Sequence, residues 1–146
     1  MDSNLKRAII VENAENPYHK GFNKQSDFLK ANTHNESCID NIDLYVKLEN
    51  DRIIDAYFEG EACAITTSAT SIMLKKIIGL TKQEARELIQ EYYRMIEEED
   101  YNHDILGELN VYFDISKQPS RKKCAILPFQ TLEKTFKLSE INNKTS

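Results

Sequence analysis

The sequence predicts an α+β domain in which a small antiparallel sheet of about three strands packs against four to five helices. Two observations lead to this prediction: apolar residues recur with a period of two from 42 to 58, and after Gly60 the period becomes helical. A hairpin followed by a run of helices is typical of the α+β class. A chain of 146 residues with 40% hydrophobic residues fits one compact domain. We expect this domain over residues 1–138, with a polar, flexible tail at 139–146.

The first part of the chain predicts one helix and one strand. An apolar face at residues 5, 9 and 10 indicates a helix from about Ser3 to Ala14, which Asn16-Pro17 ends. Few residues mark the strand, which we expect at about 26–33. This region therefore contributes little to the prediction of fold class.

A β-hairpin is the best-marked element. Residues Ile42 to Glu49 alternate apolar and polar side chains, as expected of a strand with one buried face. Asn50-Asp51 is typical of a tight turn, so Ile53 to Phe58 should return as the second arm.

Helices are expected after the hairpin. The first begins near Ile65 and stops at Gly79, a residue that favours the conformation just after a helix. Thr81 and Glu84 have the spacing of a capping box, which predicts the start of the second. A short helical segment is expected near residues 104–111.

The last helix is predicted from its prolines. Pro119 indicates a break in structure before Cys124. Pro128 suits the first turn of a helix, because proline lacks the N–H that this turn leaves unpaired. We expect this helix to end near Phe136.

Composition argues against several classes of function. The net charge is −5 and no basic patch with interleaved aromatic residues is present, so nucleic acid is not expected as a partner. No apolar run approaches the roughly 20 residues of a membrane span, and the N-terminus does not resemble a signal peptide. We therefore expect a cytoplasmic protein that does not bind a membrane.

Three cysteines in a reducing compartment do not suit disulfides. Each is expected at the end of an element: Cys38 before the first hairpin arm, Cys63 after the second, and Cys124 just before the last helix. Turns at such places can direct side chains from distant stretches toward one point. Asp40 can present its carboxylate to the same point, and three thiolates with one carboxylate complete a tetrahedral zinc site. Buried spectator cysteines and a reactive thiol remain alternatives from the residues alone.

The sequence also resembles a known family, the iron–sulfur cluster assembly proteins of the IscU and NifU N-terminal type. Besides the opening helix with Asn16-Pro17 and Gly21, the resemblance rests on motifs around the cysteines: Cys38 and Asp40; Gly60, Cys63-Ala64-Ile65, Ser68-Ala69, Ser71 and Met73; Leu106-Gly107-Glu108-Leu109; Pro119, Arg121, Lys123-Cys124-Ala125 and Leu127. It runs from about Leu5 to Leu138 and covers most of the chain.

Two features make the chain similar to the SufU branch. The interval of 61 residues from Cys63 to Cys124 has room for an extra helical segment, and Lys123 stands where the IscU branch has a histidine ligand. The chain departs from the family at Ile39 and Ala62, where glycine is usual, so the loops there are expected to differ in shape.

The resemblance implies a SufU/IscU-like fold and a role in sulfur transfer. By that resemblance, Cys38, Asp40, Cys63 and Cys124 would bind Zn²⁺, and Cys38 would accept persulfide sulfur from a PLP-dependent, SufS-like cysteine desulfurase. Arg121 would act electrostatically on the anionic sulfur. The chain would then be a zinc-dependent sulfurtransferase.

Two alternatives remain open. The first is a scaffold that assembles and transfers a [2Fe–2S] cluster, with iron at the same residues. The second is a non-catalytic binding module with a structural zinc.

Overall fold

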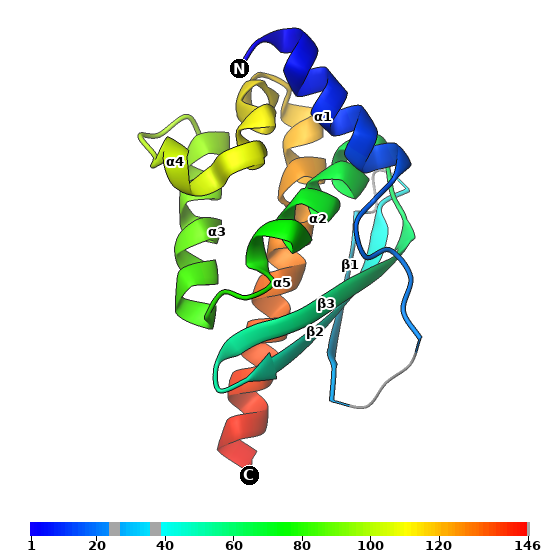
Figure 1. The fold of residues 1–146 in the computed structure, drawn as a ribbon, viewed down its shortest axis with the longest axis vertical. Coiled ribbons are helices and arrows are strands. Elements are labelled where there is room, and N and C mark those ends of the chain that lie inside the picture. The colour runs from blue at the N-terminus through cyan, green and yellow to red at the C-terminus, as the bar shows by residue number, and fades with distance from the viewer. Residues whose placement is uncertain (24–26, 36–38, 146) are drawn as a thin grey trace.

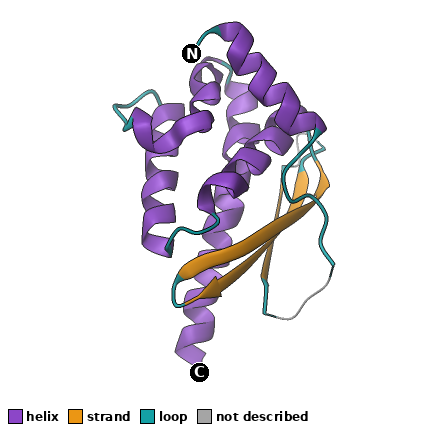
Figure 2. Ribbon diagram, viewed as in Figure 1, coloured by secondary structure: helices purple, strands orange, loops and turns teal. Residues whose placement is uncertain are grey.

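The computed structural model describes residues 1–23, 27–35 and 39–145, with side chains up to residue 141. A three-stranded antiparallel sheet packs against helices, which confirms the α+β prediction (Figures 1 and 2). In chain order the elements are α1 (Ser3–Glu15), β1 (Leu29–His34), β2 (Asn41–Glu49), β3 (Arg52–Glu61), α2 (Ala64–Ile77), α3 (Lys82–Ile96), α4 (His103–Leu106), the 3₁₀ helix η1 (Gly107–Lys117) and α5 (Pro119–Thr145).

The hairpin of β2 and β3 forms as its alternating pattern predicts. Ile42, Leu44 and Val46 are fully buried on one face of β2, and that face packs against α5. Asn50 and Asp51 both have positive φ, at 52° and 61°, which is the conformation of a two-residue hairpin turn. β1 adds on the other side of β2, giving the order β1-β2-β3.

Gly60 lets β3 approach β2 closely beside the predicted site. Its φ is +123°, and a Cβ there would lie 2.1 Å from the carbonyl oxygen of Asn41. Only glycine tolerates both the positive φ and that contact. The strand therefore brings the chain entering Cys63 next to the chain leaving Asp40.

The helices surround a common core (Figure 1). α2 lies at its centre and contacts α1, α5, η1 and β3. Asp2 caps α1 through a 2.8 Å bond from the Leu5 N–H, and α3 begins with the capping box predicted at Thr81 and Glu84. None of the helices in the described part of the chain is both long enough and apolar enough to cross a membrane.

The prediction for the last helix was wrong at both ends. α5 begins at Pro119, not near Pro128, and continues to Thr145 past Phe136, so Cys124 and Pro128 both lie inside it. An interior proline removes one helical hydrogen bond, and a side chain of α2 compensates for that loss, as described below. The predicted division at residue 138 stays a prediction, although α5 crosses it.

Candidate metal centre

The ligand atoms of Asp40, Cys63 and Cys124 all lie within 4.8 Å of one another. Asp40 stands just before β2, Cys63 just before α2, and Cys124 inside α5. Asp40 and Cys124 are buried and Cys63 is half-buried. Residues from distant stretches of the chain thus meet at one largely buried point.

Asp40 is held in place by two donors. Its Oδ1 accepts the backbone N–H of Cys63 at 2.7 Å, and its Oδ2 accepts the hydroxyl of Thr66 at 2.8 Å. These bonds offset part of the free energy required to bury a carboxylate that is only 1% exposed. They also direct Oδ2 toward the Cys63 sulfur, which lies 3.8 Å away.

Cys63 is the N-cap of α2. Its sulfur accepts the backbone N–H of Thr66 at 3.5 Å. The partial positive charge of the helix N-terminus therefore lies against a thiol that can become an anionic ligand. Here the local sequence predicted the geometry, because the strand pattern stops near Gly60 and the helical period begins soon after it.

Cys124 has a different environment. Burial raises the pKa of its thiol well above the usual range, and the neighbouring Asp40 carboxylate and Cys63 thiol raise this pKa further. A bound cation reverses that effect, because it stabilises the thiolate that the anionic neighbours disfavour. The cluster therefore has the electrostatics of a site that needs a positive ion.

These residues fit a zinc ion. A tetrahedral ion with bonds of about 2.0–2.3 Å holds its ligand atoms about 3.3–3.8 Å apart. The 3.8 Å between Cys63 Sγ and Asp40 Oδ2 meets that spacing, and the 4.8 Å limit of the whole group requires only small shifts. Thiolate and carboxylate donors are among the ligands that Zn²⁺ takes in proteins.

Two further residues predicted to be functional, Cys38 and Arg121, are not tested by the structure. Cys38 lies outside the described residues. Arg121 is exposed on α5, three residues before Cys124, and lines a pocket of about 400 Å³ together with Ile65 from the first turn of α2. Its electrostatic role stays a prediction. Ile39 is 67% exposed and, like Ala62, does not have a positive φ.

Sequence reasoning missed Thr66. It is fully buried, and its hydroxyl lies within 3.5 Å of atoms from Asp40, Cys63 and Cys124. A signal was present: α2 has hydroxyl residues at 66, 67, 68, 70 and 71 in a segment that is otherwise apolar. Polar side chains on such a helix indicate buried hydrogen bonds.

Comparison with known proteins gives a consistent result. A family model described as the NifU-like N terminal domain matches residues 6–125. The zinc-dependent sulfurtransferase SufU of Bacillus subtilis is 34% identical over 140 residues, which cover 95% of this chain and 94% of that protein. The iron–sulfur cluster assembly scaffold protein IscU of Thermotoga maritima is 39% identical over 103 residues, covering 70% of this chain and 72% of that protein.

Solved structures agree. A crystal structure from Fervidobacterium islandicum AW-1, described as an iron–sulfur cluster assembly scaffold protein for the SUF system, superposes with a TM-score of 0.75 at 32% identity, covering 86% of this chain and 91% of that one. The N-terminal part of a NifU-like protein from Brucella abortus gives a TM-score of 0.81 at 22% identity, covering 93% and 96%, and supports the fold alone.

Proposed function

The chain belongs to the NifU-like N-terminal domain family, and from that premise we propose that it serves iron–sulfur cluster assembly as a zinc-dependent sulfur acceptor. The observation that carries this proposal is the cluster of ligand atoms from Asp40, Cys63 and Cys124 within 4.8 Å. The name of the Bacillus subtilis relative, a zinc-dependent sulfurtransferase, agrees with that donor set. Cys38, two residues before Asp40, is the fourth ligand in this proposal.

The sulfur step is a thiol exchange at Cys38. Its thiolate attacks the outer sulfur of a persulfide on the donor protein. A new S–S bond forms at Cys38, the S–S bond of the donor breaks, and its electron pair stays on the donor thiolate. Zinc, when bound, supplies the positive charge that keeps the cysteine ligands ionised at neutral pH.

The donor in this proposal is a PLP-dependent cysteine desulfurase of the SufS type, acting in the cytoplasm. Such an enzyme supplies the persulfide that the step requires. The exposed Arg121, near the N-terminal end of α5, would attract the anionic persulfide as it approaches.

A scaffold for a [2Fe–2S] cluster is the second candidate. Cysteine thiolates also bind iron–sulfur clusters, and the Thermotoga maritima relative bears the name of a scaffold. Lys123 disfavours it here, because an exposed lysine precedes Cys124 where a histidine ligand would be expected by resemblance to IscU proteins.

Metal analysis and a desulfurase assay test the proposal together. We expect about one zinc per chain in aerobically purified protein and faster turnover of the cognate desulfurase. Cys38→Ala should abolish that stimulation, whereas the matched neighbour Ser37→Ala should leave it unchanged. A brown protein with charge-transfer bands would favour the scaffold. Bound zinc without any response of the desulfurase would leave only a structural zinc module.

A further inference from the structure

Pro128 removes a hydrogen-bond donor at the metal centre. In an α-helix the N–H of residue i bonds the carbonyl of residue i−4, and proline has no N–H. Pro128 lies inside α5, so the carbonyl of Cys124 loses its usual helical donor. Because Cys124 is only 7% exposed, that carbonyl needs a partner from the protein.

Thr66 supplies the missing donor. Its Oγ1 lies 3.0 Å from the carbonyl oxygen of Cys124 and 2.8 Å from Oδ2 of Asp40. A hydroxyl has only one proton to donate, so the two oxygens share it. The same Oγ1 is 3.5 Å from the sulfur of Cys63.

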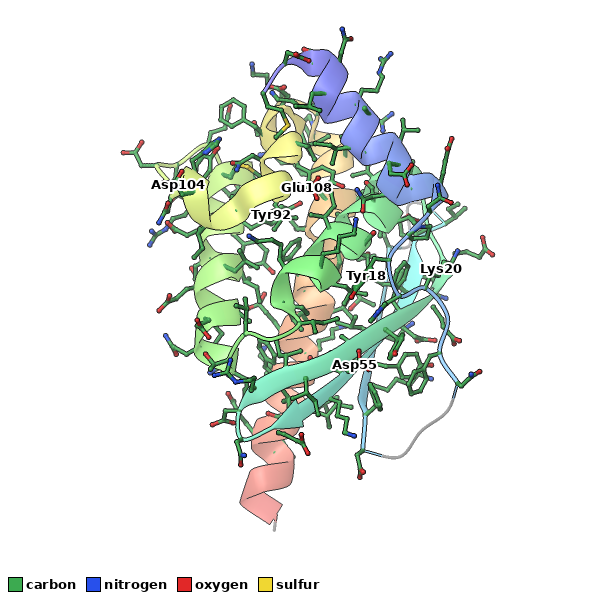
Figure 3. All side chains as sticks on the ribbon, viewed as in Figure 1. Tyr18, Lys20, Asp55, Tyr92, Asp104 and Glu108 are labelled. Atoms are coloured by element: carbon green, nitrogen blue, oxygen red, sulfur yellow. The ribbon has the colours of Figure 1, made fainter. Side chains whose placement is uncertain are left out.

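The next carbonyl along α5 also accepts a side-chain hydroxyl. The hydroxyl of Tyr92 donates to the carbonyl of Ala125 at 2.8 Å, reaching from α3 across the interior to α5 (Figure 3). Side-chain hydroxyls from α2 and α3 thus bind the turn of α5 that precedes Pro128. Of these two bonds, the one from Thr66 replaces the helical donor that Pro128 lacks.

We propose that Thr66 is a positioning residue for the metal ligands, and that Pro128 creates this role by leaving the Cys124 carbonyl for its hydroxyl. One side chain then holds the carboxylate ligand beside the sheet and the thiolate ligand on α5 at a fixed separation. The metal part of this inference rests on the proposed function. Groups that orient ligands in this way typically contribute about 10–100-fold to metal affinity.

Zinc affinity, measured by competition with a chromophoric chelator, tests the role of Thr66. Thr66→Val replaces the hydroxyl with a methyl group and should weaken binding by about tenfold, whereas Thr66→Ser should restore it to within about threefold of the wild type. Thr70→Val is the matched control, because Thr70 is a buried hydroxyl one turn along α2 that bonds only the Thr66 carbonyl at 2.7 Å among the contacts of the described residues. Unchanged affinity in Thr66→Val would overturn the inference.

A double-mutant cycle separates positioning from packing. If Thr66 acts through Asp40, then Thr66→Val should cause less than about threefold further loss in an Asp40→Ala background. The visible spectrum of the cobalt-substituted protein should change in Thr66→Val and return in Thr66→Ser, because it reports ligand geometry. An equal loss in both backgrounds, with an unchanged spectrum, would indicate packing only.

Unfolding of the metal-free protein by urea tests the role of Pro128. Thr66→Val should lower the midpoint, and this shift should shrink by about half in a Pro128→Ala background, where an N–H again reaches the Cys124 carbonyl. Equal shifts would refute the part assigned to Pro128. This cycle needs no metal, so it tests the hydrogen bond between Thr66 and the Cys124 carbonyl whether or not the protein binds zinc. A wild type that binds no zinc would contradict the proposed function and not this hydrogen bond.

Discussion

Cys63 and Cys124 contribute to the same cluster from contrasting places. Cys63 stands at the open start of α2, half-buried, and its sulfur accepts a backbone N–H that the helix leaves unpaired. Cys124 lies inside α5, where burial and anionic neighbours raise the pKa of its thiol. The difference teaches that sulfurs of one cluster can be placed in different ways: a helix N-terminus donates a hydrogen bond to one, whereas burial around the other favours its neutral thiol.

Replacing each thiol with a hydroxyl should produce the largest effect. Cys63→Ser and Cys124→Ser should each lower zinc affinity by about 100-fold or more, because serine is not ionised at neutral pH and is not a usual zinc ligand. The two variants should differ without metal. Serine still caps α2, so Cys63→Ser should have the same free energy of unfolding as the wild type. Cys124→Ser buries a hydroxyl, so its free energy of unfolding should be lower by about 1 kcal/mol.

Chelator competition measures the affinities, and urea unfolding in the presence of a strong chelator measures the stabilities. Thr70→Val again serves as a control for a buried side chain near the cluster. Equal stability of the two serine variants would show that the contrast between the two positions does not extend to the metal-free protein.

The same contrast explains which parts of the molecule could be predicted from sequence. The start of α2 depends on local signals, namely Gly60 and the switch of hydrophobic period, so the place of Cys63 was predicted correctly. Where α5 passes through Pro128, the carbonyl of Cys124 binds the hydroxyl of Thr66, a residue distant in sequence. Local rules place a proline at the first turn of a helix, and no local signal indicates that another helix binds the carbonyl whose donor the proline removes.

The cluster itself could be predicted only in part. Its residue types were visible in the sequence, and the resemblance to a family grouped Asp40, Cys63 and Cys124. The two hydrogen bonds that orient Asp40 were not visible, because they depend on the close approach that Gly60 permits between β3 and β2. The contribution of Cys38 stays a prediction, since that residue lies outside the described chain.

The next largest effect is expected at the C-terminal end of α5. Lys82, whose side chain is only 8% exposed, donates to Ser139 at 2.7 Å, and Arg86 pairs with Glu140. Ending the chain after Leu138 would remove Ser139 and Glu140, both of which lie beside the Lys82 ammonium. This change should lower the free energy of unfolding by about 1–3 kcal/mol. Ending it after Ile141 is the matched control and should change stability little. Equal stability of both forms in urea would support a separate tail at 139–146.

A pH series sharpens the contrast between the metal-free and zinc-bound states. The raised pKa of Cys124 keeps its thiol protonated in the folded, metal-free protein, whereas the unfolded thiol ionises near pH 8.5. Above that pH the unfolded state binds fewer protons, so the free energy of unfolding falls, by at most about 1.4 kcal/mol per pH unit for this group. Below pH 8.5 the Cys124 thiol is protonated in both states, so it adds no pH dependence to the free energy of unfolding.

Zinc-bound protein should lack this loss between about pH 8.5 and 9.5, because its thiolates are already ionised. Urea midpoints at both ends of that window, with zinc and with chelator, measure the difference. Cys124→Ser should remove the slope of the metal-free protein. Above about pH 10, the buried Tyr92 and Tyr112, whose pKa values burial also raises, should add a further decline in both states. Identical slopes with and without zinc would contradict the electrostatic account of the cluster.

The smallest effect is expected at Arg121, which differs from the cluster in being exposed. Its charge stands three residues before Cys124 and beside the pocket that Ile65 lines, so it should attract an incoming anionic persulfide without orienting any ligand. Arg121→Ala should slow sulfur uptake from the desulfurase by about threefold at low salt, with unchanged zinc affinity. High salt should reduce the difference, because exposed charges are screened over about 10 Å or less.

The matched control is Lys137→Ala, an exposed cation on the same helix about three and a half turns beyond Cys124. A loss that persists at high salt, or that appears equally in the control, would show that Arg121 does not act by electrostatic attraction at this site.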